Sequence, residues 1–119
     1  MRSSSSSVFK WPDPESVLSA ARRWADHEAR TRPGLLKLGY FGSYARGESG
    51  VGSDLDWVAV VESSDAPFIG RGAAFDLLDL PVPAEIVVYT RDEWLRLLAS
   101  GSRFARVMRS EAVWLVDRP

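Results

Sequence analysis

Two aspartates separated by one residue, Asp54 and Asp56, stand at the start of an apolar stretch that is typical of a strand. Side chains two positions apart on a strand project from the same face, so the two carboxylates are expected to lie together. Carboxylates that are forced together repel each other, and a hard divalent cation such as Mg²⁺, which prefers oxygen ligands, relieves that repulsion. Taken alone, an Asp-x-Asp pair is more often a solvated strand entrance or a helix cap.

A glycine–serine pair, Gly42-Ser43, follows a short apolar segment and is separated from Asp54 by ten residues. If a short helix begins at this pair, its free N–H groups and its positive dipole end suit a phosphate group. Gly42 lets a ligand approach the backbone closely, and the Ser43 hydroxyl adds a hydrogen bond. A Gly-Ser pair by itself is usually a simple turn, so its weight comes from its occurrence together with the aspartates.

A third carboxylate, Glu85, interrupts the apolar run 83–88. A charge inside a buried strand is costly unless it is paired or bound to a metal. If this strand lies beside the one that contains Asp56, Glu85 completes a three-carboxylate cluster; otherwise it is an edge-strand charge that discourages aggregation. Arg46 either neutralises phosphate charge or faces solvent. Ser53 either bonds a phosphate oxygen or caps the loop.

The elements that must position these residues follow from hydrophobic periodicity and from helix-start signals. Asp13 and Pro14 predict the start of a helix, and Thr90 with Glu93 forms a capping box. Strands that alternate with helices predict an α/β fold of two or three layers, a single domain over 11–119 after a flexible, serine-rich segment 1–10. The expected elements are a helix that ends at 33–34, strands over 35–41 and 55–61, a helical run within 68–80, a strand over 84–89, helices over 91–98 and 102–109, and a strand over 112–116.

The composition narrows the chemistry. The 119 residues include no cysteine and one histidine, His27, which argues against a Cys nucleophile, a thiolate zinc site and a histidine-based triad. A net charge of −1 gives no general attraction to nucleic acid. No apolar stretch reaches the roughly 18 residues of a membrane span, and the N-terminal segment lacks the apolar centre of a signal peptide, so we expect a soluble, cytoplasmic protein. Arg103, Arg106 and Arg109 form either a phosphate- or partner-binding surface or, as we favour, a solvated helix face.

The order Gly-Ser, ten residues, Asp-x-Asp and a later strand carboxylate resembles the signature of the DNA polymerase beta-like nucleotidyltransferase superfamily. More narrowly, the string GSYARGESGVGSDLD and the small size are similar to the minimal nucleotidyltransferases (MNT proteins), and the resemblance spans about residues 13–117. It implies the nucleotidyltransferase fold, an α/β (α+β) arrangement with a small mixed sheet flanked by helices. One departure is Glu85, because the third carboxylate of the superfamily is more often Asp.

The resemblance also implies a site and a reaction. Two Mg²⁺ ions would bind the carboxylates, ATP would place its triphosphate on the Gly-Ser turn, and AMP would pass to a hydroxyl of a partner protein as pyrophosphate leaves. The implied catalytic and metal-binding residues are Asp54, Asp56 and Glu85, and the implied nucleotide-binding residues are Gly42, Ser43, Arg46 and Ser53.

MNT proteins commonly pair with a helical HEPN-domain protein as a toxin–antitoxin system in which the MNT member is the antitoxin. The resemblance therefore implies a HEPN-domain partner and leaves a homo- or hetero-oligomer open. From the net charge and the lack of a long apolar stretch, we expect no direct binding to nucleic acid or to a membrane. Two alternatives stay open: a partner-binding module that turns over little, and a catalytic subunit that acts on a small-molecule or RNA acceptor.

Overall fold

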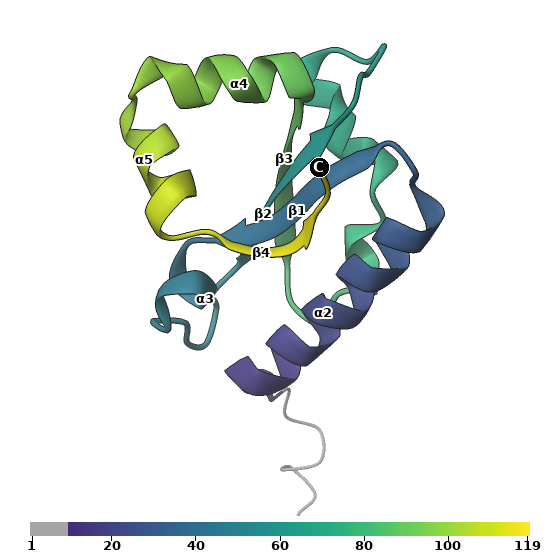
Figure 1. Ribbon diagram of the computed structural model, residues 1–119. Coiled ribbons are helices and arrows are strands. Elements are labelled where there is room, and N and C mark those ends of the chain that lie inside the picture. The colour runs from purple at the N-terminus through teal and green to yellow at the C-terminus, as the bar shows by residue number, and fades with distance from the viewer. Residues whose placement is uncertain (1–9) are drawn as a thin grey trace, which may run out of the picture.

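A four-stranded mixed sheet lies at the centre of the structure (Figure 1). The computed structural model describes residues 10–119, so the expected flexible segment over 1–10 lies, except for Lys10, outside the described residues. In the spatial order β3-β2-β1-β4, strand β1 pairs antiparallel with β2 and with β4, whereas β2 pairs parallel with β3. The four strands are β1 (Leu35–Phe41), β2 (Leu55–Val61), β3 (Ala84–Thr90) and β4 (Val113–Asp117), which confirms the four predicted strands.

The helices begin at the side chains that the sequence indicates. Asp13 caps α2 (Pro14–Thr31) by accepting a hydrogen bond of 2.8 Å from the Ser16 N–H. The capping box of Thr90 and Glu93 opens α4 (Arg91–Ser100), and Ser102 caps α5 (Arg103–Ser110). A short helix, α3 (Ser43–Arg46), follows Gly42 and confirms the predicted turn of helix after the Gly-Ser pair.

The crossover between the parallel strands β2 and β3 is the element that the sequence described least well. The predicted helical run within 68–80 is two 3₁₀ helices, η1 (Phe68–Ala74) and η2 (Leu77–Asp79). Gly70 and Gly72 disfavour an α-helix because glycine loses the most backbone freedom on ordering. Phe75, between the two helices, is extended and buried against the core.

Helices cover both faces of the sheet, so the fold has three layers (Figure 1). Alternate residues of a strand point to opposite faces. Leu55 and Trp57 of β2 belong to the core that contains α2, whereas Val58 and Val60 belong to the core that contains α4 and α5. Asp56 shares the alternation of Val58 and Val60, so its carboxylate lies on the side of α4 and α5. This mixed sheet flanked by helices confirms the predicted fold class.

The helices of residues 10–119 include none with the length and apolar character that crossing a membrane requires.

Candidate active site

The turn between β1 and α3 brings the backbone of Gly42 against the carboxylate of Asp56. Gly42 has a φ of +81°, a left-handed conformation that favours glycine. A Cβ placed on Gly42 would lie 2.5 Å from Oδ2 of Asp56, which is too close for a real contact. Any other residue at this position would therefore both strain the turn and displace the Asp56 side chain.

A cleft of about 720 Å³ lies between α3, the start of β2 and α5. The structure brings five of the seven predicted site residues to its lining, from the α3 turn and from the beginning of β2. Within the part of the chain that the structure describes, the Ser43 hydroxyl takes part in no hydrogen bond, so it is available to a ligand. The cleft is lined by Phe41, Gly42, Ser43, Arg46, Asp54, Asp56, Arg103, Phe104, Val107 and Glu111.

The third predicted carboxylate lies beside the cleft rather than in its lining. Glu85 is the partner of Asp56 in the parallel register of β2 and β3, so the strand adjacency that the sequence left open is present. The Glu85 side chain is exposed and lines a separate pocket of about 120 Å³, which Asp56 also lines. Asp56 therefore lies between Asp54 on the cleft side and Glu85 on the other side.

The electrostatics of Asp56 reflect this position. Partial burial raises the pKa of Asp56, and the like charges of Glu85 and Asp54 raise it further, while Arg46 opposes them. In residues 10–119, no three side chains of His, Cys, Asp or Glu stand close enough together to form a metal-binding group as they are arranged. The three carboxylates are thus electrostatically coupled without forming a closed set of ligands.

Two of the predicted nucleotide-binding residues are engaged by the protein itself. Arg46 donates from Nε to Glu48 at 2.8 Å and from Nη1 to Glu111 at 3.3 Å. The Ser53 hydroxyl accepts a hydrogen bond of 2.9 Å from the Gly50 N–H and does not line the cleft. This geometry favours the interpretation of Ser53 as a loop cap.

Glu111 is a residue of the cleft that the sequence analysis missed. Its Oε2 accepts a hydrogen bond of 2.8 Å from the Gly42 N–H, and its side chain is largely buried. No motif surrounds it in the sequence. It reaches Gly42 because β4 pairs with β1, in a register that aligns Val113 with Tyr40.

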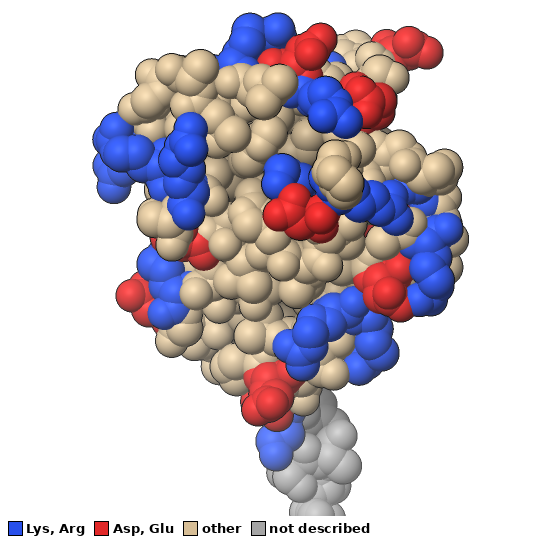
Figure 2. Space-filling view, viewed as in Figure 1, with Lys and Arg blue, Asp and Glu red and all other residues tan. Residues whose placement is uncertain are grey.

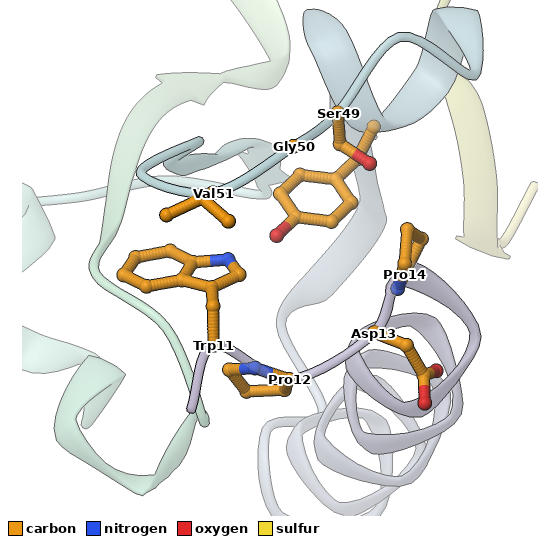
Figure 3. A pocket seen from close by; sticks show the side chains of 8 residues that line it. Trp11, Pro12, Asp13, Pro14, Ser49, Gly50 and Val51 are labelled. Atoms are coloured by element: carbon orange, nitrogen blue, oxygen red, sulfur yellow. The ribbon is translucent and has the colours of Figure 1, made fainter. Parts of the chain in front are cut away.

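A second pocket, of about 220 Å³, lies between the segment that leads into α2 and the loop that joins α3 to β2 (Figure 3). The indole of Trp11 faces Val51, so the residues that precede α2 and the loop line this pocket together (Figure 3). None of the predicted site residues lines this pocket.

Comparisons with known proteins place this geometry in a family. Residues 24–104, more than half of the chain, match the sequence profile of the nucleotidyltransferase domain. A crystal structure of a proposed nucleotidyltransferase from Sulfolobus solfataricus has a similar fold, with a TM-score of 0.59 and 20% identity over 85% of this chain and 80% of that chain. A toxin–antitoxin structure solved with AMP-PNP is similar with a TM-score of 0.50 and 18% identity, over 81% of this chain and 73% of that chain. The comparison with curated proteins found no match. Because the profile covers most of the sheet and the α3 turn, the chain belongs to the nucleotidyltransferase domain family.

Proposed function

We propose that this protein transfers AMP from ATP to a hydroxyl group of a partner protein. Members of its family transfer nucleotidyl groups and typically use a nucleoside triphosphate and a divalent metal. The observation that carries the proposal is the convergence of Gly42 and Ser43 with Asp54 and Asp56 around one cleft. Its volume, about 720 Å³, lies within the usual range of small-molecule sites.

The residues around Asp56 fit a divalent cation. They offer carboxylate oxygens. Partial burial raises the pKa of Asp56, the like charges of Glu85 and Asp54 raise it further, and a hard cation relieves that repulsion. Asp54 and Asp56 would hold the metal, with Glu85 as the further ligand. Bound divalent cations screen the triphosphate charge and acidify an acceptor hydroxyl.

The chain's own residues then have definite tasks. The Ser43 hydroxyl would bind a phosphate oxygen, and Gly42 would keep the backbone close to the triphosphate. The acceptor oxygen forms a bond to the α-phosphorus, and the bond from that phosphorus to the oxygen bridging to the β-phosphate breaks, so pyrophosphate leaves. Glu85, exposed beside Asp56, would accept the proton of the hydroxyl.

The proposed acceptor is the HEPN-domain protein of a toxin–antitoxin pair in which this chain is the antitoxin. The fold similarity to a toxin–antitoxin structure with AMP-PNP supports this choice. The crossover between β2 and β3 also offers apolar contact surface, because Ile69 and Leu78 are 95% and 94% exposed. We place the pair in the cytoplasm, where ATP is made and used.

The test follows the phosphate that moves. With purified protein, partner and Mg²⁺, label from α-labelled ATP should become attached to the partner, and label from γ-labelled ATP should leave with pyrophosphate. The partner should gain the mass of one or more AMP units. Attachment of the γ-label would contradict nucleotidyl transfer, and label found only on an RNA or small-molecule acceptor would contradict the protein acceptor.

A second candidate is a partner-binding module that turns over little. The observation that favours it is the Glu111 carboxylate, which already accepts the Gly42 N–H at the turn expected to bind the triphosphate. A tight complex with an unmodified partner, in the presence of ATP and Mg²⁺, would support this candidate over the first.

A further inference from the structure

The cleft contains two arginines, and only one of them lacks a partner among residues 10–119. Arg46 already forms ion pairs with Glu48 and Glu111, so its guanidinium is engaged by the protein. Arg103, at the start of α5, lines the same cleft. Over residues 10–119 its guanidinium makes no hydrogen bond and no ion pair. A triphosphate bound between the carboxylates would need a cationic partner, and Arg103 is the one that remains.

The other arginines of α5 are used differently. Arg106 donates a hydrogen bond of 2.8 Å to the carbonyl of Gly101, and Arg109 donates one of 3.1 Å to the carbonyl of Leu98. Both bonds tie α5 to the end of α4. Figure 2 shows basic side chains gathered over α5, beside the acidic and basic side chains near α3. Of the three arginines that recur along this helix, Arg103 is the one whose position the fold leaves unexplained.

The location of Arg103 on its helix is unfavourable for stability. Ser102 is the N-cap, so Arg103 is the first residue of α5, and no acidic residue lies in this first turn. A cation at a helix N-terminus opposes the helix dipole. The helix is nevertheless held firmly at the cleft, because Phe104 packs edge-on against Phe41 at 5.5 Å between ring centroids and Met108 is 1% exposed.

We propose that Arg103 binds the triphosphate of the nucleotide, and hence the departing pyrophosphate, from the α5 wall of the cleft. This assignment rests on the proposed function, and it adds a substrate-binding residue from α5 to the Ser43 hydroxyl from α3. The guanidinium would donate hydrogen bonds to phosphate oxygens and neutralise charge that builds up on pyrophosphate as the bond to the α-phosphorus breaks.

The experiment compares ligands that contain or lack the β- and γ-phosphates. Binding of ATP, inorganic pyrophosphate and AMP is measured by calorimetry in Mg²⁺ for the wild type, R103Q, R103K and the control R96Q. Arg96 is exposed on α4 and lies outside the cleft lining, so R96Q makes the same change of charge elsewhere. R103Q should lower the affinity for ATP and for pyrophosphate roughly 10- to 100-fold and leave the affinity for AMP nearly unchanged. R103K should recover part of the loss, and R96Q should match the wild type.

The stability of the apo protein supplies a second readout. Because Arg103 opposes the helix dipole, the melting temperature of R103Q should equal or exceed that of the wild type. Three results for R103Q would each overturn the assignment: an equal loss of affinity for AMP and ATP, an unchanged affinity for ATP, or a clear fall in the melting temperature. If the wild type itself binds neither ATP nor pyrophosphate, the proposed function fails, and the assignment of Arg103 fails with it.

Discussion

Asp56 on β2 and Glu85 on β3 are direct neighbours in the parallel register, and their like charges act on each other across the two strands. Together with burial, this repulsion raises the pKa of Asp56 in the folded protein. The free energy of unfolding falls when a carboxyl has a higher pKa in the folded than in the unfolded protein. For Asp56 this loss begins as pH rises through the unfolded-state pKa of 3.8 and is complete above the folded-state pKa. At neutral pH the metal-free site therefore lowers the stability of the fold, which is common for sites that bind ligands.

Replacing Asp56 by Asn should abolish transfer and raise the melting temperature of the metal-free protein by a few degrees at neutral pH and low ionic strength. The gain should vanish in acid below pH 3.8, where the wild-type carboxyl is protonated in both states. Added Mg²⁺ should stabilise the wild type more than the variant, because a ligand of the native state raises its stability. Thermal melts in EDTA and in Mg²⁺ measure both effects, with Asp65→Asn as an exposed control outside the cleft.

Glu85→Gln should behave in the same direction, because it removes one of the charges that raise the pKa of Asp56. The metal-free variant should melt higher than the wild type, and its stabilisation by Mg²⁺ should be smaller. Thermal melts of this variant in EDTA and in Mg²⁺ test whether Glu85 belongs to the carboxylate site. A variant that melts lower and keeps the full Mg²⁺ shift would identify Glu85 as a structural strand residue and reduce the carboxylate site to Asp54 and Asp56.

Variants of the two residues of the Gly-Ser turn should separate an effect on nucleotide binding from an effect on folding. Ser43→Ala should raise the KM for ATP about tenfold and leave the melting temperature unchanged, because the hydroxyl bonds nothing within residues 10–119. Gly42→Ala should lower the melting temperature and activity together, since its Cβ would collide with Asp56 at a φ of +81°. Gly50→Ala is the matched control, because a Cβ there meets nothing within 4 Å. A wild-type KM for Ser43→Ala would remove Ser43 from the site.

Glu111→Gln should lower the KM for ATP. The amide oxygen of Gln can still accept the Gly42 N–H, whereas the loss of the negative charge frees Arg46 and removes a repulsive group from the cleft. Glu111→Ala should instead lower the melting temperature, because the Gly42 N–H loses its acceptor. Steady-state kinetics and melts on both variants, with Glu48→Gln as the control that frees Arg46 from outside the cleft, distinguish these effects. A higher KM for Glu111→Gln would show that the carboxylate assists nucleotide binding.

The acid stability of the fold should depend on Glu93. Hydrogen bonds from Arg71 and from the Thr90 N–H lower the pKa of Glu93 from 4.5 to about 2. A depressed folded-state pKa stabilises the fold fully above 4.5, and this contribution is lost as pH falls towards 2. Glu93→Gln should therefore melt several degrees lower at pH 7, with a difference that shrinks across the acid range. A difference that does not depend on pH would assign the effect to packing alone.

Most element boundaries were predictable because they depend on local chemistry. Asp13 with Pro14 and Thr90 with Glu93 satisfy the free N–H groups of the turn that follows them, whatever the rest of the chain does. The segment 68–80 was less predictable, because glycines within an apolar run weaken the helical signal and the choice between α and 3₁₀ geometry depends on how Phe75 reaches the core.

By itself, the sequence determined the elements of the site that belong to one stretch of chain: the Gly42-Ser43 turn, the short helix and the strand that carries Asp54 and Asp56. These elements lie close together because β1 and β2 are adjacent in the chain and pair antiparallel, with Phe41 opposite Asp56. Only the tertiary structure decided that Glu85 lies beside Asp56, that Glu111 reaches Gly42 and that Arg103, alone among the three arginines of α5, lines the cleft. These contacts join segments far apart in the chain, and they depend on the strand order β3-β2-β1-β4 and on its registers. Packing of whole faces sets that order, and no local pattern of residues encodes it.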